Sequence, residues 1–317
     1  MNSFNFVRVD SKTNLMENPK IFDAVIIGGS YAGLSAAMSL GRARRQVLII
    51  DSGNPCNRQT PQSHNFITHD GEEPAAIAAI AKEQVLKYPT VTFLDGTVTD
   101  AVKDGNGFKV KTEDGQSFGS RKLLFAMGMH DLMPETPGFA ECWGISILHC
   151  PYCHGYEVSD KKTGIIGNGD IGYEFAKMIS NWTKELVVFT DGKSVLSEEQ
   201  LAKLKSHRID VVDKEIDHFE HQGGYIQHIV FKDQSKYKVD AVYAKPHAKQ
   251  QCAFPVELGC EINTHGCIAT DALQKTAVPG VYAAGDCTSM GRAISGAVSS
   301  GAVAGMFINK EIIEEDF

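Results

Sequence analysis

Residues 28–33 read G-G-S-Y-A-G and connect an apolar run at 23–28 to a small-residue segment at 31–44. A second apolar run follows at 46–51, so the whole segment is expected to form a strand, a helix and a second strand. Such a βαβ unit builds a parallel sheet that is covered by helices. The stretch therefore predicts an α/β fold with a Rossmann-like, doubly wound sheet.

The residues of this turn also predict a ligand. Gly28 suits the tight turn, and Gly33 lets the helix pack closely on the strand, so that the helix N-terminus faces a pyrophosphate. Ser30 stands where the middle glycine usually lies, but its small hydroxyl side chain can itself bind phosphate. Asp51 closes the second strand eighteen residues after Gly33, where a carboxylate can accept the ribose hydroxyls. Together these residues predict a dinucleotide site.

A second and complete fingerprint, G-N-G-D-I-G, occupies residues 167–172 between an expected strand at 162–167 and an expected helix at 173–182. Its acid, Asp191, lies nineteen residues past the last glycine of this run and follows the expected strand 186–189. A carboxylate there favours a free ribose diol and repels a 2′-phosphate. Because Lys193 is the nearby cation and no arginine pair follows, the residues alone favour NADH over NADPH.

The stretch H-C-P-Y-C-H-G-Y-E at residues 149–157 lies between the two fingerprints. Cys150 and Cys153 are two residues apart, close enough to form a small disulfide ring and to act as a redox pair. A Cys-x-x-Cys pair is also half of a zinc site. Three residues could supply the missing ligands: Cys142, His149 and His154. The position between two dinucleotide sites favours an electron relay, and no metal is assigned.

Composition limits the class of protein. The 317 residues suffice for two ordinary domains, with 43% hydrophobic and 22% charged residues. The net charge of -8 argues against binding to nucleic acid or to an anionic membrane surface. The apolar runs are strand-sized, and residues 1–20 are polar without the features of a secretory signal, so a cytoplasmic protein is expected. The cysteines outside the pair are expected to be small apolar residues.

Two other segments are expected to contact a ligand. Residues 54–70 are polar, contain prolines and lack periodicity, so they are expected to form a long loop that touches a ligand. Asp286 follows Gly285 at the end of an expected strand, where doubly wound sheets meet their ligands. The remaining expected elements are a helix at 73–88, a meander of short strands at 91–118, a buried strand at 121–128 and a Gly- and Ala-rich helix from 292 to about 309.

In this order and spacing, G-G-S-Y-A-G, Cys-Pro-Tyr-Cys before Gly-Asn-Gly-Asp-Ile-Gly, and Ala-Ala-Gly-Asp with a following Arg-Ala-Ile resemble the low-molecular-weight thioredoxin reductase family. The resemblance covers nearly the whole chain, from about residue 22 to residue 309. The tail His154-Gly155-Tyr156-Glu157 is most similar to the branch that includes the gliotoxin- and holomycin-type dithiol oxidases.

The resemblance implies a discontinuous FAD domain at 21–135 and 247–317, with a pyridine-nucleotide domain at 136–246 inserted between its halves. It also implies a homodimer and a rotation of one domain against the other. Residues 1–20 are expected to be a disordered N-terminal extension. Since Met16 is a second candidate start, the sequence does not decide whether residues 1–15 are native.

The family also implies a path for electrons. NADPH or NADH would reduce FAD, and the flavin would reduce the disulfide, with Cys153 facing the flavin and Cys150 attacking the disulfide of the partner. Typical members carry an aspartate after the second cysteine as proton donor. This chain has His154 instead, with Glu157 close behind, and a histidine can exchange a proton near neutral pH. The alternative is that His154 only caps or packs the turn.

The expected site residues fall into three groups. The catalytic group is Cys150, Cys153, His154 and Glu157. The FAD group is Gly28, Ser30, Tyr31, Ala32, Gly33, Asp51, Asn57, Arg58, Gln59, His64, Asn65, Gly128, Gly285, Asp286, Arg292, Ala293 and Ile294. The pyridine-nucleotide group is Gly167, Gly169, Asp170, Ile171 and Asp191.

Three functions are weighed. The first is a thioredoxin reductase-type enzyme that passes electrons from NAD(P)H through FAD and the dithiol to a thioredoxin-like protein or a small-molecule disulfide. The second is a flavin-dependent oxidase that oxidises small-molecule dithiols with oxygen. The third is a redox-inert module that binds zinc or a nucleotide.

Overall fold

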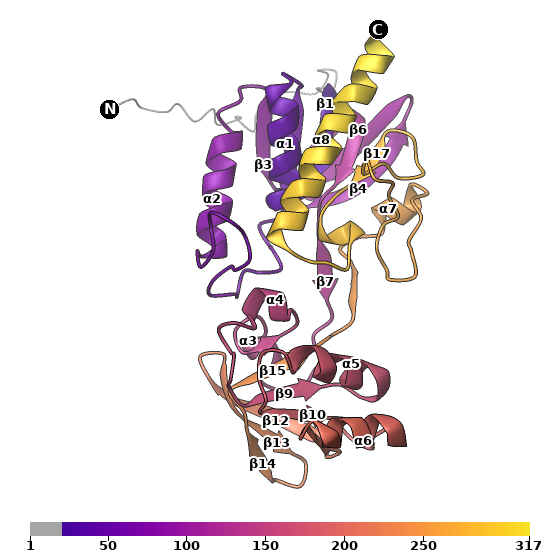
Figure 1. The fold of residues 1–317 in the computed structure, drawn as a ribbon. Helices are drawn as coiled ribbons and strands as arrows, with labels where there is room; N and C mark the ends of the chain where they lie inside the picture. The colour runs from indigo at the N-terminus through magenta and orange to yellow at the C-terminus, as the bar shows by residue number, and fades with distance from the viewer. Residues whose placement is uncertain (1–20) are drawn as a thin grey trace, which may run out of the picture.

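The computed structural model describes residues 21–317, so the expected extension at 1–20 lies outside the described part. These residues form two α/β lobes that are joined by a pair of short strands (Figure 1). No helix among them combines the length and the hydropathy that a membrane crossing needs.

The larger lobe is built on a seven-stranded sheet in the order β3-β2-β1-β6-β5-β4, with β17 paired to β6. Its strands are β1 (Ile21–Ile27), β2 (Val47–Asp51), β3 (Val91–Asp95), β4 (Val98–Asp104), β5 (Gly107–Thr112), β6 (Ser117–Phe125) and β17 (Val281–Ala283). The expected meander is wrong for β3, which runs parallel to β2 at the sheet edge. Because β17 pairs with β6, the C-terminal segment completes a sheet that begins with β1.

Helices α1 (Tyr31–Arg42), α2 (Pro74–Val85) and α8 (Ile294–Asp316) belong to this lobe, and α8 packs along α1. The packing is close because a Cβ added at Gly301 would lie 2.1 Å from the carbonyl oxygen of Ala32. Helix α8 continues to Asp316, past the expected end at about residue 309. Its last turns are held to the sheet by Glu311 and Glu315, which both pair with the buried Lys122 of β6.

The smaller lobe contains a parallel five-stranded sheet in the order β11-β10-β9-β15-β8 and an antiparallel three-stranded sheet, β12-β13-β14. Its strands are β8 (Ile147–Leu148), β9 (Thr163–Ile166), β10 (Leu186–Phe189), β11 (Asp210–Val212), β12 (Ile216–Gln222), β13 (Tyr225–Phe231), β14 (Lys236–Lys238) and β15 (Ala241–Ala244). Its longer helices are α5 (Gly169–Ile179) and α6 (Glu198–Ser206). Helix α5 begins on the fingerprint glycine itself, four residues before its expected start.

Two antiparallel strands, β7 (Met129–Asp131) and β16 (Ala248–Gln250), carry the chain between the lobes. Both are fixed to the larger lobe. Gln250 donates from Nε2 to the carbonyl oxygens of Gly266 and Cys287, at 2.8 and 3.0 Å. The short helices are α3 (Phe139–Cys142), α4 (Pro151–His154), α7 (Phe254–Glu257) and the 3-10 turn η1 (Asp286–Thr288). Helix α4 lies on the side of the smaller lobe that faces the larger one (Figure 1).

Candidate functional site

A cavity of about 930 Å³ is lined by residues of both lobes. Its volume is at the upper end of the range found for small-molecule and cofactor sites. Sixteen of the seventeen residues expected to hold FAD line it, and Gly33 is the exception. Gly33 packs beneath the turn, where an added Cβ would lie 1.9 Å from the carbonyl oxygen of Gly28.

The turn between β1 and α1 is shaped for a phosphate group. Gly28 has a φ of 104°, and a Cβ there would lie 2.4 Å from the carbonyl oxygen of Ala126. Ser30 occupies the N-cap position of α1, and its side chain makes no capping hydrogen bond, so the hydroxyl and the first N–H groups of α1 are available to an anion. Asp51 accepts from the N–H of Gly29 at 2.9 Å, which holds its carboxylate at the edge of this turn.

The other wall of the cavity comes from the segment that leads into α8. Arg292 lies 3.5 Å from Asp286 and also donates two hydrogen bonds to Asp131 of β7. Burial raises the pKa of Asp286, and the Arg292 guanidinium opposes that shift. Ala293 is the N-cap of α8 and provides no side-chain cap, so the N-terminus of this 23-residue helix opens toward the cavity.

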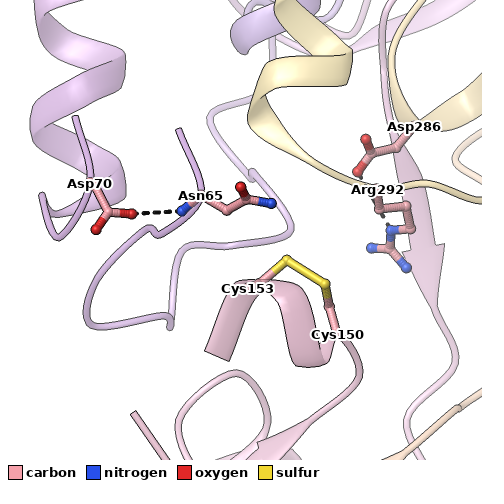
Figure 2. Close-up of a disulfide and its surroundings, with 6 residues drawn as sticks. All are labelled: Asn65, Asp70, Cys150, Cys153, Asp286 and Arg292. Atoms are coloured by element: carbon pink, nitrogen blue, oxygen red, sulfur yellow. Dashed lines mark hydrogen bonds and ion pairs between the residues drawn. A yellow bond between two sulfur atoms is a disulfide. The ribbon is translucent and has the colours of Figure 1, made fainter. Parts of the chain in front are cut away.

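The dithiol closes the side of the cavity that belongs to the smaller lobe. Cys150 and Cys153 form a disulfide at the start of α4, and Figure 2 shows it facing the segments that carry Asn65 and Arg292. Cys153 lines the cavity and Cys150 does not. The two sulfurs are therefore unequal, and Cys153 is the one directed at whatever the cavity holds.

His154 follows Cys153 and also lines the cavity. Burial lowers the pKa of His154, the nearby Glu157 carboxylate raises it, and His64 lowers it further. Glu157 lies outside the cavity lining, with its Oε1 atom 3.4 Å from Nε2 of His64. His64, which was expected to contact the cofactor, thus lines the cavity and also pairs with a residue of the other lobe.

The side chains weighed as possible zinc ligands are not gathered into a metal site in the described part of the chain. Residues 21–317 contain no group of three His, Cys, Asp or Glu side chains placed to hold a metal ion. Cys142 is buried, and burial raises the pKa of its thiol to about 11. His149 stacks on Trp143 with ring centroids 5.8 Å apart, and burial lowers the pKa of His149 to about 4.

The second fingerprint lies away from this cavity, at the turn between β9 and α5, and none of its five expected residues lines the cavity. Its polar side chains already have partners within the protein. Asp191, with a φ of 48°, accepts from the N–H of Ile216 at 2.7 Å, and Asp170 accepts from Gln200 at 2.7 Å. Asn168 accepts from the N–H groups of Gly169 and Val195, both at 2.9 Å.

Some cavity residues were not predicted. Cys56 and Cys252 line the cavity, although both were expected to be ordinary small apolar residues. A signal existed for Cys56, because it belongs to the loop that was expected to touch a ligand. Trp143 and His149 also line the cavity. His149, directly before Cys150, was considered only as a possible zinc ligand, and no role was predicted for Trp143.

The residues present fit a dinucleotide cofactor of the FAD type. A glycine turn that admits no side chain, an uncommitted N-cap hydroxyl and a held carboxylate suit the pyrophosphate and ribose. The start of α8 suits a ring that carries negative charge.

A profile of the pyridine nucleotide-disulphide oxidoreductase family matches residues 22–301. The thioredoxin reductase tcpT of Claviceps purpurea is 32% identical to this chain, over 95% of this chain and 97% of that protein. Among solved structures, HlmI superposes with a TM-score of 0.90 and 30% identity, covering 96% of each chain. An oxidoreductase from Agrobacterium tumefaciens gives a TM-score of 0.86 and 34% identity, covering 92% of this chain and 99% of that one. The resemblance and the α/β fold expected from the motifs are confirmed.

Proposed function

The chain belongs to the pyridine nucleotide-disulphide oxidoreductase family, and from this premise we propose that it passes electrons from NADH or NADPH through FAD and the Cys150–Cys153 dithiol to a disulfide. It is an enzyme of the thioredoxin reductase-like type, and its family implies a flavin and a pyridine nucleotide. The substrate would be a thioredoxin-like protein or a small-molecule disulfide. One observation carries the proposal: Cys153 lines the same cavity as the dinucleotide turn.

Each part of the cavity has a task in this proposal. Ser30 and the first turn of α1 would hold the pyrophosphate, and Asp51 would hold the ribose of the adenosine half. Asp286 and the start of α8 would hold the other half. When bound, FAD would supply the two-electron chemistry that connects a nicotinamide to a disulfide. The flavin ring of FAD would have to reach Cys153 for this purpose. One cavity is lined both by the turn between β1 and α1 and by Cys153.

The two cysteines would divide the thiol chemistry. Cys153 would receive the electron pair, and Cys150, which lies outside the cavity lining, would attack the disulfide of the substrate as a thiolate. His154 would hold or give the proton that the leaving sulfur needs, and Glu157 would set the charge of that imidazole.

For the electron donor we propose NADH in preference to NADPH, because Asp191 lies where a 2′-phosphate would bring negative charge. Asp191 keeps one carboxylate oxygen free after its bond to Ile216. We also propose a homodimer on the family resemblance, which light scattering of the purified protein would test. The cytoplasmic location stays a prediction.

An anaerobic titration of the purified flavoprotein with NADH and NADPH in parallel tests the proposal. Loss of the flavin absorbance with either nucleotide, followed by reduction of an added disulfide, is the expected result. Loss of absorbance only with a dithiol, and peroxide formation in air, would favour the dithiol oxidase instead. Colourless protein that contains zinc would overturn both.

A further inference from the structure

His64 connects the two lobes beside the dithiol. It belongs to the loop at 54–70 in the larger lobe, and its Nε2 atom lies 3.4 Å from Oε1 of Glu157 in the smaller lobe. Its other ring nitrogen, Nδ1, lies 3.7 Å from Oδ1 of Asp70. One imidazole therefore has a carboxylate at each nitrogen, and each carboxylate comes from a different part of the chain.

Solvent exposure changes along this row of side chains. Asp70 is 66% exposed and Glu157 is 36% exposed, whereas His64 between them is 16% exposed. His154 is partly buried and lines the cavity, and Glu157 follows it by three residues in the chain. The row thus leads from the sulfur that faces the cavity to a carboxylate in bulk water.

The proposed chemistry requires such a route. A disulfide that takes up two electrons breaks its S–S bond and must gain two protons to become a pair of thiols. Cys153 faces a cavity that a bound flavin would fill, so water has poor access to that sulfur from the cavity side. Side chains then offer the protons a route, and an imidazole suits this task because one ring nitrogen can accept a proton while the other donates one.

We propose that His64 and Asp70 form the outer half of a proton path that begins at His154 and passes Glu157. When the S–S bond takes up the electron pair that the proposed flavin would supply, it breaks, the sulfur of Cys153 takes one proton through His154, and the sulfur of Cys150, outside the cavity lining, takes the other from water. Through the Glu157 carboxylate His64 then returns a proton to His154, and His64 recovers its own from water beside Asp70. The direction reverses when the dithiol is oxidised. This inference rests on the proposed function and deepens it.

The loop itself is built to hold this arrangement. Asn65 has a φ of 59°, and its N–H donates to Oδ1 of Asp70 at 2.7 Å, so the same carboxylate oxygen fixes the turn and faces the histidine. Ser63 and Glu72 form a bridge that closes the base of the loop. Because Glu157 belongs to the other lobe, the path exists in the arrangement of lobes that brings Cys153 to the cavity.

Two substitutions separate proton transfer from structure. His64→Gln keeps a polar side chain of similar reach but cannot accept a proton at one ring nitrogen and donate one from the other. Asp70→Asn removes the charge and keeps the oxygen that accepts from Asn65. His69→Gln is the matched control, because His69 lies in the same loop and pairs with Glu72 at 3.0 Å, and it does not line the cavity.

The measurement uses holoenzyme whose dithiol has been reduced, mixed anaerobically with 5,5′-dithiobis(2-nitrobenzoate). The first release of thionitrobenzoate reports attack by Cys150. The second reports Cys153, which must lose its proton before it can resolve the mixed disulfide. We expect His64→Gln to slow the second phase by about tenfold near pH 7, toward the lower end of general acid-base effects because His64 acts through another residue. Asp70→Asn should slow it less, and His69→Gln should match the unmodified protein.

Adding imidazole to the assay gives the decisive comparison. Imidazole should restore much of the rate of the second phase in His64→Gln, in proportion to its concentration, and leave the rate in His69→Gln unchanged. A second phase that is unaltered by His64→Gln, a loss that imidazole does not restore, or a loss that follows a lower flavin content would each overturn the path. Failure of the proposed function looks different, since the unmodified flavoprotein would then fail to reduce any disulfide with NAD(P)H.

Discussion

Arg292 donates two hydrogen bonds to Asp131, from Nη1 at 2.5 Å and from Nη2 at 3.0 Å. The two side chains are only 15% and 7% exposed. Asp131 ends β7, one of the two strands between the lobes, and Arg292 precedes the helix whose start opens toward the cavity. This ion pair therefore holds strand β7, which connects the lobes, against the wall of the proposed flavin site.

The first prediction follows from this pair. Asp131→Asn should destabilise the protein by about 3 kcal/mol, because it removes the carboxylate that makes both hydrogen bonds and leaves the buried guanidinium with only Asp286, 3.5 Å away, as a counter-charge. Thermal or urea unfolding of the holoenzyme measures the change. Glu174→Gln is the control, since Glu174 pairs with Lys177 on the surface with 61% exposure, and its loss should cost less than about 0.5 kcal/mol. Equal costs for both variants would contradict this account.

Part of this wall could be predicted from the sequence and part could not. Gly285, Asp286 and Arg292 lie in a short motif at a strand end, where doubly wound sheets bind ligands. Asp131 lies in the stretch M-H-D-L-M-P, which has no composition or spacing that indicates a partner for an arginine 161 residues away. Strand-end motifs are local patterns, whereas the pairing of two segments across the fold depends on tertiary packing.

The second fingerprint shows the same limit. Its glycines and Asp191 were recognisable from spacing, but the bond from Ile216 to Asp191 joins two segments that no local pattern relates. The contact between His64 and Glu157 was also hidden, because it depends on how the lobes face one another. Helix α8 extends beyond its expected end for a similar reason: acidic residues after residue 309 pair with the buried Lys122 and the half-buried Arg121 of β6.

The second prediction concerns the dithiol. Cys150→Ser should leave reduction of the flavin by NAD(P)H intact and abolish turnover of an added disulfide, because the attacking thiolate is lost. Cys153→Ser should also abolish turnover but leave a Cys150 thiol that still attacks a reactive disulfide once. Stopped-flow absorbance of the flavin and a single-turnover thiol assay separate these outcomes. Disulfide turnover that survives in Cys150→Ser would mean that the relay assignment is wrong.

The third prediction concerns the choice between NADH and NADPH. Asp191→Ser should improve use of the 2′-phosphorylated cofactor by removing a negative charge from its path. Asp191→Asn is the better-controlled variant, because asparagine tolerates the left-handed backbone at this position, where φ is 48°, and keeps the oxygen that accepts from Ile216. The ratio of kcat/KM for NADPH and NADH measures the effect. An unchanged ratio in both variants would remove Asp191 from cofactor selection.

The fourth prediction concerns acid stability at the end of α8. Burial raises the pKa of Glu311, but its bonds to Lys122, Lys275 and Tyr282 lower it more, to about 2, from a usual value of 4.5. A depressed carboxyl pKa stabilises the fold above the usual value, and this contribution is lost as pH falls from about 4.5 toward 2. Glu311→Gln should therefore lower the unfolding free energy at pH 7 by about 3 kcal/mol.

Glu311→Gln should also flatten the dependence of stability on pH in this acid range. Urea unfolding curves recorded at about five pH values between pH 2 and pH 7 measure both effects. Glu314→Gln serves as the matched control on the same helix, because Glu314 is 62% exposed and lies 3.7 Å from Lys310. A control variant that loses as much stability as Glu311→Gln would show that helix charge, and not the buried contact, is responsible.

The fifth prediction tests the close packing of α8 on α1. A Cβ at Gly301 would lie 2.1 Å from the carbonyl oxygen of Ala32, and backbone cannot move away as a flexible side chain could. Gly301→Ala should therefore destabilise the protein by about 2 kcal/mol or more. Gly296→Ala lies on the same helix, where the nearest atom to an added Cβ is 3.6 Å away, so it should be neutral or stabilise by up to about 1 kcal/mol through its higher helix propensity.

Since Ala32 also lines the cavity, Gly301→Ala should in addition weaken flavin retention, which gel filtration at low concentration measures. Two variants of equal stability would show that the helices separate freely at this point.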